Sequence, residues 1–322
     1  MPSESYIKSL GPIGPIVQFI RPYTLVPPAL GMISGSLCAL GAFPHFETSA
    51  PCDLLGWGKW MPWEWMRLTI AVGLGALMAA MLNAASNGLN QIFDIRADEI
   101  NKPARPLPSE RISLIAAWAC TILFFLTALV LAAAVNLPCF LLASAATVCT
   151  VLYSAKPIKL KRFPFIANFV VALPRGVLLK VAGWSAIKSI YGWEPWTIGL
   201  IFGLFLFGTT STKDFSDTAG DTIDGVETLP LRYGFKKTAW FVAPFFIFPF
   251  LLIPIFSRLG ILTGNKSLLA LLGVILAVWG SATAWRMLKT PEELSGENHP
   301  SWRSMYNMMM TLQIGFAIAY LI

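Results

Sequence analysis

Long apolar segments recur through the whole chain and leave few folds open to it. A helix needs about 20 residues to cross the roughly 30 Å hydrocarbon core of a bilayer, and only helices and closed barrels satisfy their backbone polar groups in lipid. None of the segments alternates polar and apolar residues as a barrel strand does. Charged residues make up only 13% of the chain, against about 25% in soluble domains. The sequence therefore predicts an all-α, polytopic membrane protein.

We predict nine membrane-spanning segments within one membrane domain over residues 1–322. The first segment contains Pro22, Pro27 and Pro28, so we expect it to be kinked or to begin after them. The segments cover residues 14–42, 69–93, 113–134, 138–153, 164–186, 196–212, 239–257, 267–288 and 304–322.

Basic residues are distributed unevenly among the predicted loops. The loops after the second, fourth, sixth and eighth segments carry fifteen, and the other four carry five. By the positive-inside rule, the basic loops and the N-terminus face the cytoplasm. The net charge of +7 then reflects topology and a phospholipid-facing surface. Because no nucleic-acid-binding motif accompanies this charge, we expect the lipid bilayer, and not a nucleic acid, as its partner.

Five of the seven aspartates lie in two short runs, a sixth, Asp224, follows the second run closely, and each run closes an apolar segment. The runs read NQIFDIRAD at 90–98 and KDFSDTAGD at 213–221, both on the predicted cytoplasmic side. Acidic residues spaced three or four apart share one face of a helix. The first face carries Asn90, Asp94 and Asp98, with Asn87 one turn earlier, and the second carries Asp214, Asp217 and Asp221, with Asp224 close behind.

Two acidic faces of this kind suit a hard cation. Mg²⁺ is usually held by one or two carboxylates plus substrate phosphates, so faces opposed across a cavity could hold Mg²⁺ ions around a diphosphate and offset its charge. The alternative is that the acids solvate helix ends and pair with lysines, but grouped carboxylates at a membrane boundary are costly and usually functional. His45 and His299 fall in separate loops, and no glycine-rich phosphate cradle is present. Diphosphate recognition then rests on metal and basic side chains.

At these residues the chain resembles the UbiA superfamily of intramembrane prenyltransferases. The family's NDxxDxxxD motif corresponds to 90–98, and its INxPxRPxPSG stretch is similar to NKPARPLPSE at 101–110. Its YSxxPxxLKR loop is similar to YSAKPIKLKR at 153–162, and its DxxxD motif with a TLPxxxG tail corresponds to Asp217, Asp221 and TLPLRYG at 228–234. Gln91 departs from the family's aspartate, although Gln occurs there in the homogentisate-prenyltransferase branch. Motif order and spacing match from about Arg21 to Gly234.

The resemblance implies nine transmembrane helices around a central cavity with a polar cytoplasmic cap. It also implies a reaction in which a polyprenyl diphosphate loses diphosphate with Mg²⁺ assistance and an acceptor captures the allylic cation. Gln91 and the Arg175–Gly176 segment lead us to expect an aromatic quinone precursor of homogentisate or hydroxybenzoate type. A chlorophyllide-type carboxylate and a glyceryl phosphate are the alternative acceptors. A cation-coupled transporter is less favoured, because the acids lie at one membrane face and no inverted repeat is visible.

We expect the acidic residues to bind metal and the nearby basic residues to bind diphosphate. Lys156, Arg105 and Lys213 would contact diphosphate oxygens as fixed positive charges. The predicted metal ligands are Asn90, Asp94, Asp98, Asp214, Asp217 and Asp221, and the predicted catalytic residues are Asp94, Asp98, Asp217, Asp221 and Lys156.

Other polar residues receive lesser roles. The ring of Tyr153 would face the allylic cation, and Asn87 would support the first run. Arg21 and Asn168 resemble polar positions of the family near the cavity. The cations of the loop after the fourth segment, Lys159, Lys161 and Arg162, are expected to set topology or contact lipid headgroups. Arg175 and Lys180 lie inside the fifth segment, where charge is costly, so we expect them to face the cavity or a partner.

Overall fold

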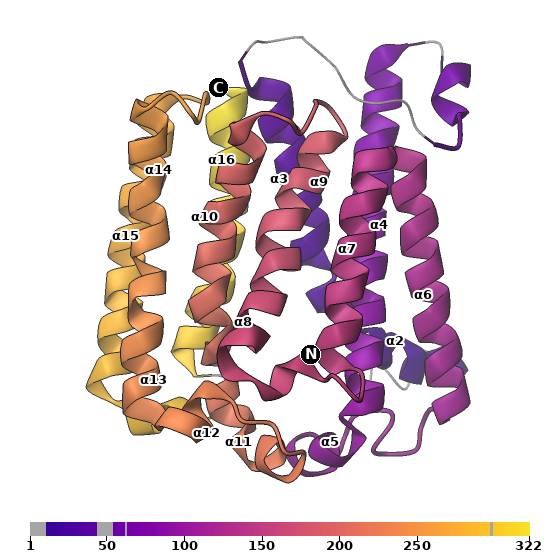
Figure 1. The fold of residues 1–322 in the computed structure, drawn as a ribbon, viewed down its shortest axis with the longest axis vertical. Helices are drawn as coiled ribbons and strands as arrows, with labels where there is room; N and C mark the ends of the chain where they lie inside the picture. Colours follow the sequence, from indigo (N-terminus) through magenta and orange to yellow (C-terminus); the bar gives the residue numbers. More distant parts are fainter. Residues whose placement is uncertain (1–10, 44–53, 62, 297–298) are drawn as a thin grey trace.

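The computed structural model describes residues 11–43, 54–61, 63–296 and 299–322, and His45 lies outside these ranges. Within them every regular element is a helix or a helical turn, and no strand is present (Figure 1). The all-α prediction is confirmed.

Each predicted apolar segment contains one helix or one interrupted helix. In chain order these are α2 (Gly14–Ile20) with α3 (Val26–Gly41), α4 (Glu64–Phe93), α6 (Leu114–Val135), α7 (Leu137–Ser154), α8 (Pro164–Ala172) with η5 (Leu173–Leu178) and α9 (Leu179–Ser185), α10 (Trp193–Thr209), α13 (Phe235–Val242) with η7 (Ala243–Phe246) and α14 (Phe248–Arg258), α15 (Lys266–Lys289) and α16 (Pro300–Leu321). Shorter elements connect them: η1 (Gly11–Ile13), η2 (Pro22–Thr24), η3 (Trp57–Trp60), α5 (Ile95–Asn101), η4 (Leu160–Arg162), η6 (Thr210–Thr212), α11 (Asp214–Ile223), α12 (Leu229–Tyr233) and η8 (Pro291–Ser295).

Six of these helical stretches are long and apolar enough to cross a membrane. They are Glu64–Phe93, Leu114–Val135, Leu137–Ser154, Pro164–Ser185, Phe235–Arg258 and Lys266–Lys289. A seventh is the pair Gly14–Thr24 and Val26–Gly41, which is bent by 44°. The bend falls among the three prolines, so the predicted kink is confirmed. α10 has only 17 residues, and α16 begins with a polar turn that contains Arg303. Nine spans therefore stay a prediction.

The long helices form a bundle that closes on itself. Neighbours in sequence pack together, and the last helix, α16, packs against the first long one, α3. α9 contacts α3, α4, α7 and α10, so it fills the middle of the bundle at the end away from α5 and α11. The two acidic runs lie at the opposite end, where α5, α11 and α12 form the lower edge in Figure 1.

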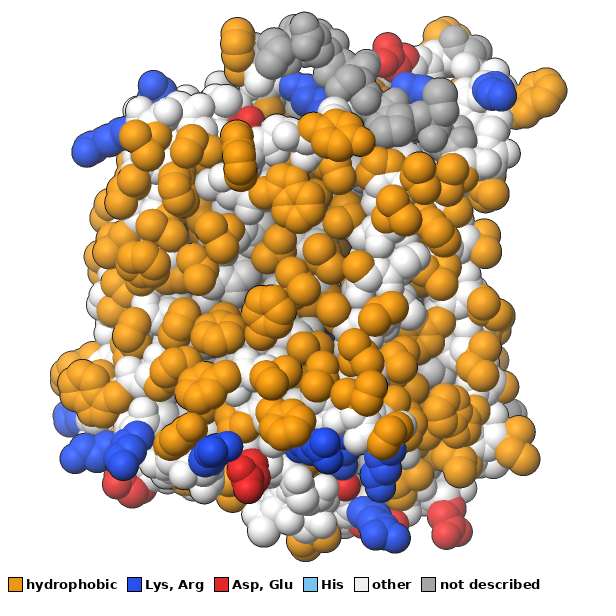
Figure 2. Space-filling view, viewed as in Figure 1, with side chains coloured by type: hydrophobic (Ala, Val, Ile, Leu, Met, Phe, Trp, Pro, Cys, Tyr) orange, Lys and Arg blue, Asp and Glu red, His pale blue; other side chains and the backbone are white. Residues whose placement is uncertain are grey.

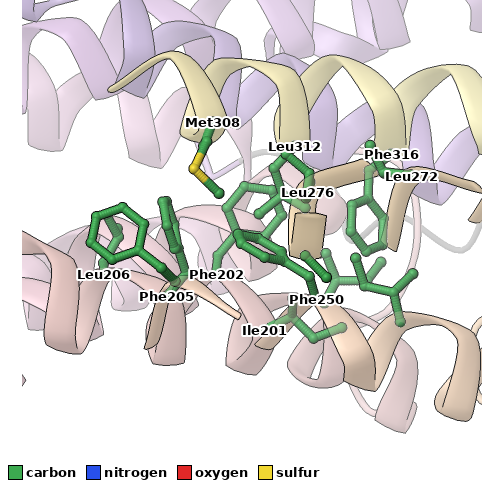
Figure 3. Close-up of a cluster of buried hydrophobic side chains, with 14 of the residues drawn as sticks. Ile201, Phe202, Phe205, Leu206, Phe250, Leu272, Leu276, Met308, Leu312 and Phe316 are labelled. Carbon is green, nitrogen blue, oxygen red and sulfur yellow. The ribbon is translucent and has the colours of Figure 1, made fainter. Parts of the chain in front are cut away.

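The core between α10, η7, α14, α15 and α16 is built from aromatic and aliphatic side chains (Figure 3). Phe202, Phe205 and Phe250 are at most 1% exposed. Helix association in lipid depends on close packing, which small residues permit. A Cβ on Gly280 would lie 1.7 Å from the carbonyl oxygen of Phe246, so only glycine lets α15 approach η7 this closely. The visible flank is mainly hydrophobic, with charges gathered at its ends (Figure 2).

Candidate active site

The first acidic run follows one nearly continuous helical path from α4 into α5. The backbone N–H of Asp94 donates to the carbonyl of Asn90 at 3.0 Å, and that of Asp98 donates to Asp94 at 2.8 Å. Asn90, Asp94 and Asp98 therefore follow one another turn by turn, as their spacing predicted. Asp94 and Asp98 are buried at 7% and 5% exposure.

The second run forms a helix of its own. α11 holds Asp214, Asp217 and Asp221, which are all half-buried. Their spacing places them on one face of this helix. Gly225, with φ +66°, follows α11, and its left-handed backbone turns the chain away.

Asn101 joins the two runs. Its amide nitrogen donates to the carbonyl of Asp217 at 3.0 Å, and its amide oxygen accepts from the N–H of Gly220 at 3.0 Å. A Cβ on Gly220 would lie 2.7 Å from the carbonyl oxygen of Ala97, so glycine allows α11 to rest directly on α5. Asn101 had no predicted role, although it opens the NKPARPLPSE stretch.

Two buried lysines of the η4 loop also bridge the runs. Lys161 pairs with Asp94 of the first run, and its Nζ lies 3.6 Å from Oδ2 of Asp224, just after the second. The Nζ of Lys159 lies 2.6 Å from the same oxygen of Asp224. Lys159 and Lys161 are only 6% and 7% exposed. Neither lysine is exposed enough to contact lipid headgroups, so that part of the prediction is wrong for them, whereas their role in setting topology stays a prediction.

Asp98 and Asp217 also form ion pairs, and two of their three cationic partners were predicted from the sequence. Arg105 pairs with Asp98, and Lys213 Nζ lies 2.8 Å from Oδ2 of Asp217. Lys102, which had no predicted role, donates from Nζ to both oxygens of Asp217 at 2.8 and 3.0 Å. Arg105 and Lys213 thus lie at the site, where they neutralise carboxylates.

Lys156 differs from these cations. It is exposed, and among the described residues no hydrogen bond or ion pair joins it to an aspartate. The structure brings Lys159 and Lys161 of the same loop to the acids, but not Lys156. The sequence alone does not show which of these lysines is buried, because Lys156, Lys159 and Lys161 are the same residue type within one loop.

The three acids of α11 differ in how burial and neighbouring charges set their pKa values. Although burial acts to raise it, Lys213 and Lys102 hold the pKa of Asp217 well below its usual range. Burial, together with the nearby carboxylates of Asp214 and Asp217, raises the pKa of Asp221 to about 7. Burial raises the pKa of Asp214 to about 6, despite Lys213 nearby. α11 therefore carries crowded carboxylates that are short of positive charge.

This donor set fits a divalent cation that arrives with a phosphate ligand. In the described part of the chain, no three His, Cys, Asp or Glu side chains converge closely enough to hold a metal ion by themselves. Mg²⁺ needs only one or two carboxylates when substrate phosphates and water complete its shell. A divalent cation bound there would supply the positive charge that the carboxylates of Asp214 and Asp221 lack.

Three amide side chains on one face of α4 hydrogen bond to the segment around the break between α2 and α3. Asn83 and Asn87 donate from Nδ2 to Thr24, at 2.9 Å to its carbonyl and 2.8 Å to its Oγ1 respectively. Gln91 donates from Nε2 to the carbonyl of Phe19 at 2.7 Å and is 1% exposed. Asn87 and Gln91 therefore position the segment around Arg21, whose φ of 56° is left-handed.

Tyr153, Asn90 and Asn168 have different surroundings. Tyr153 is half-buried at the end of α7, within electrostatic reach of Asp94, Asp214 and Asp221. Ser154 beside it lies 3.4 Å from Oδ1 of Asn90, so α7 borders the first run. Asn168 donates from Nδ2 to the carbonyl of Phe207 and to Ser211 Oγ, at 2.7 and 2.8 Å. It fixes α8 to the end of α10, and its substrate-binding role stays a prediction.

Comparison with known proteins identifies the family. The model of the UbiA prenyltransferase family matches residues 48–298, more than half of the chain. The chain belongs to the UbiA prenyltransferase family. It is therefore a membrane-embedded prenyltransferase, and the transporter alternative is set aside.

Curated relatives carry two kinds of name. A digeranylgeranylglyceryl phosphate synthase of Sulfurisphaera tokodaii is 35% identical over 56% of this chain and 63% of its own length, so the match spans less than two thirds of that relative. A protein of the same name from Thermococcus kodakarensis is 30% identical over 81% of this chain and 83% of its own length. A probable homogentisate phytyltransferase 2 of Oryza sativa is 29% identical over 69% of this chain and 56% of its own length.

Solved structures share the fold. A UbiA homologue from Archaeoglobus fulgidus, bound to GPP and Mg²⁺, gives a TM-score of 0.70 at 17% identity, covering 96% of this chain and 100% of that one. A structure described for digeranylgeranylglyceryl phosphate synthase gives a TM-score of 0.67 at 23% identity, covering 96% and 99%.

Proposed function

We propose that this prenyltransferase takes its isoprenyl group from a polyprenyl diphosphate, with Mg²⁺ at the two acidic runs, and releases diphosphate. The observation that carries the proposal is the meeting of the runs, which Asn101 and Lys161 join at one end of the bundle. The fold-level likeness to a homologue bound to GPP and Mg²⁺ supports the same donor and ion.

The metal ligands in this proposal are the oxygen-bearing residues of the two faces. Mg²⁺, when bound, would offset the charge that builds on the departing diphosphate and orient it. In this proposal the ligands on one side of the diphosphate are Asn90, Asp94 and Asp98. The ligands on the other side are Asp214, Asp217 and Asp221.

The cations of the site change partners in this proposal. The structure pairs four cations with the carboxylates, namely Lys102, Arg105, Lys161 and Lys213. Once the carboxylates have another positive partner, these side chains are free to donate charge-assisted hydrogen bonds to diphosphate oxygens. They would stabilise the leaving group from positions fixed before the reaction, which is the most effective form of electrostatic catalysis.

The reacting carbon then lies on the membrane side of the aspartates. Tyr153 lies within electrostatic reach of acids of both runs, and in this proposal its ring stabilises the allylic cation. Lys156, exposed nearby, keeps its predicted role as a diphosphate ligand only if the loop moves when substrate binds. The whole site lies at the bundle end that carries most basic loops, which we place in the cytoplasm as the positive-inside rule directs.

For the acceptor we favour a lipid glyceryl phosphate. The digeranylgeranylglyceryl phosphate synthase of T. kodakarensis aligns over most of both chains, which supports this class. A homogentisate-type aromatic acceptor is the second candidate, supported by the rice relative. Gln91, which favoured the aromatic class in sequence, directs its amide nitrogen to the carbonyl of Phe19.

The test is a reconstitution of the complete reaction. Purified protein is incubated with geranylgeranyl diphosphate, Mg²⁺ and one of four acceptors: 3-O-geranylgeranylglyceryl phosphate, homogentisate, 4-hydroxybenzoate or chlorophyllide. We expect prenylated glyceryl phosphate and equimolar diphosphate, both abolished by EDTA and restored by Mg²⁺. No product and no diphosphate release with any acceptor would refute the donor and metal assignment. Product with homogentisate alone would refute the acceptor.

A further inference from the structure

Asp224 is a buried acid for which the proposed metal site has no use. It ends α11, where its backbone N–H donates to the carbonyl of Gly220 at 3.0 Å and the left-handed Gly225 follows it. Its side chain is only 9% exposed. Lys159 and Lys161, both from the η4 loop, approach the same oxygen, Oδ2. Asp224 therefore joins the end of α11 to a loop that is far away in the sequence.

Lys159 is the closer partner of Asp224. Its Nζ lies 2.6 Å from Oδ2 of Asp224 and 3.4 Å from the backbone carbonyl oxygen of the same residue. The φ of Lys159 is 42°, in the left-handed region that residues with a side chain seldom adopt. The pair therefore fixes Asp224 to a turn of unusual backbone conformation, and it does so without a contact to either acidic run.

Lys161 is shared between Asp224 and the first acidic run. It pairs with Asp94, and its Nζ lies 3.6 Å from Oδ2 of Asp224, which is within ion-pair distance but longer than a hydrogen bond. In the part of the chain that the structure describes, no third acid forms an ion pair with Lys161. An ammonium group has three N–H donors, so a small rotation of this side chain exchanges one acid for the other.

A metal ion at Asp94 would compete with Lys161. Asp94 is a metal ligand in the proposed function, and a divalent cation there both occupies its carboxylate and repels the ammonium of Lys161. The side chain of Lys161 is 8% exposed, so water does not replace the lost partner, and a buried charge without a partner is costly. Asp224 is the acid that is left for it.

We propose that Asp224 is a positioning residue, which becomes the counter-ion of Lys161 when the metal ion takes Asp94. This inference rests on the proposed function and adds to it the residue that lets the metal ion and Lys161 occupy the site together. Asp224 contacts neither the ion nor the diphosphate. Lys161, held by Asp224, keeps N–H donors for diphosphate oxygens. Without Asp224, Lys161 has only Asp94 as a partner and opposes metal binding.

The test measures metal-dependent binding in the absence of turnover. The purified full chain in nanodiscs is titrated with Mg²⁺ at a fixed concentration of radiolabelled geranylgeranyl thiodiphosphate, and the Mg²⁺ concentration for half-maximal binding is recorded. Asp224→Asn removes the charge but keeps the shape of the side chain. It should raise this concentration by about 10-fold or more, since close buried charge pairs couple that strongly.

Two single variants are the references for Asp224→Asn. Asp224→Glu restores the charge and should bring the half-maximal Mg²⁺ concentration to within about 3-fold of the wild type, since most of the charge coupling returns. Glu227→Gln makes the same change of charge three residues later, at a side chain that is 68% exposed. It should leave the Mg²⁺ concentration unchanged, because an exposed charge is screened by solvent.

Two double variants separate the exchange of partners from a general effect of the lost charge. Asp224→Asn with Lys159→Met has the net charge of the wild type and should show the same rise. Because it removes both members of a buried pair, it is also better tolerated than Asp224→Asn alone, and it carries the test if melting curves show that Asp224→Asn is unfolded. In a Lys161→Met background, Asp224→Asn should change the Mg²⁺ concentration by less than about 2-fold. If Lys161→Met abolishes binding of the analogue, the charge-neutral variant decides.

Three outcomes would overturn the proposal. One is an unchanged Mg²⁺ concentration in Asp224→Asn and in the charge-neutral variant. Another is a rise in Asp224→Asn that the charge-neutral variant lacks, since the lost charge would then act through its field alone. The third is a rise that persists in the Lys161→Met background. A wild type whose binding of the analogue does not depend on Mg²⁺ refutes the proposed metal site itself, and this inference with it.

Discussion

At the scale of single residues, ion pairs give the site its order before any ligand binds. Asp94, Asp98 and Asp217 each hold a lysine or arginine. A buried charge without a partner is costly, so the pairs hold these carboxylates in place. Burial raises the pKa of Asp94 despite its pair with Lys161, and it also raises the pKa of Asp214 and of Asp221, which form no ion pair among the described residues.

The first prediction concerns the acids themselves. Asp94→Ala and Asp217→Ala should each lower turnover with geranylgeranyl diphosphate and Mg²⁺ at least ~100-fold, because an electrostatic contact to a leaving group is worth several kcal/mol. Both proteins should remain folded, as a thermal melt would show. Glu227→Gln, exposed beside Arg232, is the control and should keep near-normal rates. Near-normal turnover in both aspartate variants would contradict the metal assignment.

Lys161 is the cation whose role the structure changed most. Lys161→Met leaves Asp94 and Asp224 without their shared partner. Removal of one member of a buried pair costs about 3–5 kcal/mol, so we expect a lower unfolding free energy and a loss of turnover. Lys237→Met, exposed on α13, should change neither. If both substitutions have equally small effects on the denaturation midpoint and on turnover, Lys161 has no role in the site. It would then only set topology, as predicted from the sequence.

At the scale of elements, the periodicity of the acids was sufficient to predict two faces, and both are present. The sequence did not show how α5 and α11 meet, because that depends on Asn101 and on the missing Cβ of Gly220. Nor could it separate buried Lys161 from exposed Lys156, five residues apart in one basic loop. Long-range partners decide burial there, and a single sequence contains no information on them.

The packing of α11 on α5 leads to a third prediction. Gly220→Ala places a methyl group 2.7 Å from the carbonyl oxygen of Ala97 and should push the two acidic faces apart. We expect a higher Mg²⁺ concentration for half-maximal turnover, by about 10-fold or more, since misplacement of about 1 Å commonly costs that much. Ala219→Ser, on the exposed side of α11, is the matched control. An unchanged Mg²⁺ dependence in Gly220→Ala would show that the two faces do not act together.

The contact between α4 and α2 leads to a fourth. Gln91→Glu replaces the donor to the carbonyl of Phe19 by an acceptor within a buried site, which should lower the unfolding free energy by at least about 2 kcal/mol. Asn307→Asp, exposed on α16, should cost far less in the same chemical denaturation. Acceptor preference should not change in Gln91→Glu. A switch of acceptor with unchanged stability would show that Gln91 contacts the acceptor after all.

At the scale of the whole molecule, composition and segment length were enough for the fold class, since lipid leaves helices as the only solution for such segments. The six clear spans and the bent first pair follow from that. The count of nine depends on α10, which has 17 residues, and on α16, whose first turn is polar. The length and hydropathy of these two segments do not by themselves decide whether they cross the membrane.

Orientation is the prediction that belongs to the whole molecule. Fifteen basic residues lie in the loops of one end and five in those of the other, so the acidic runs should face the cytoplasm. In a variant with the five natural cysteines replaced by alanine and checked for activity, Ser109→Cys reports on that end and Tyr191→Cys, 98% exposed, on the other. An impermeant maleimide should label Ser109→Cys only in inside-out vesicles and Tyr191→Cys only in right-side-out vesicles. The reverse pattern would place the site on the outer face, where a cytoplasmic pool of prenyl diphosphate could not reach it.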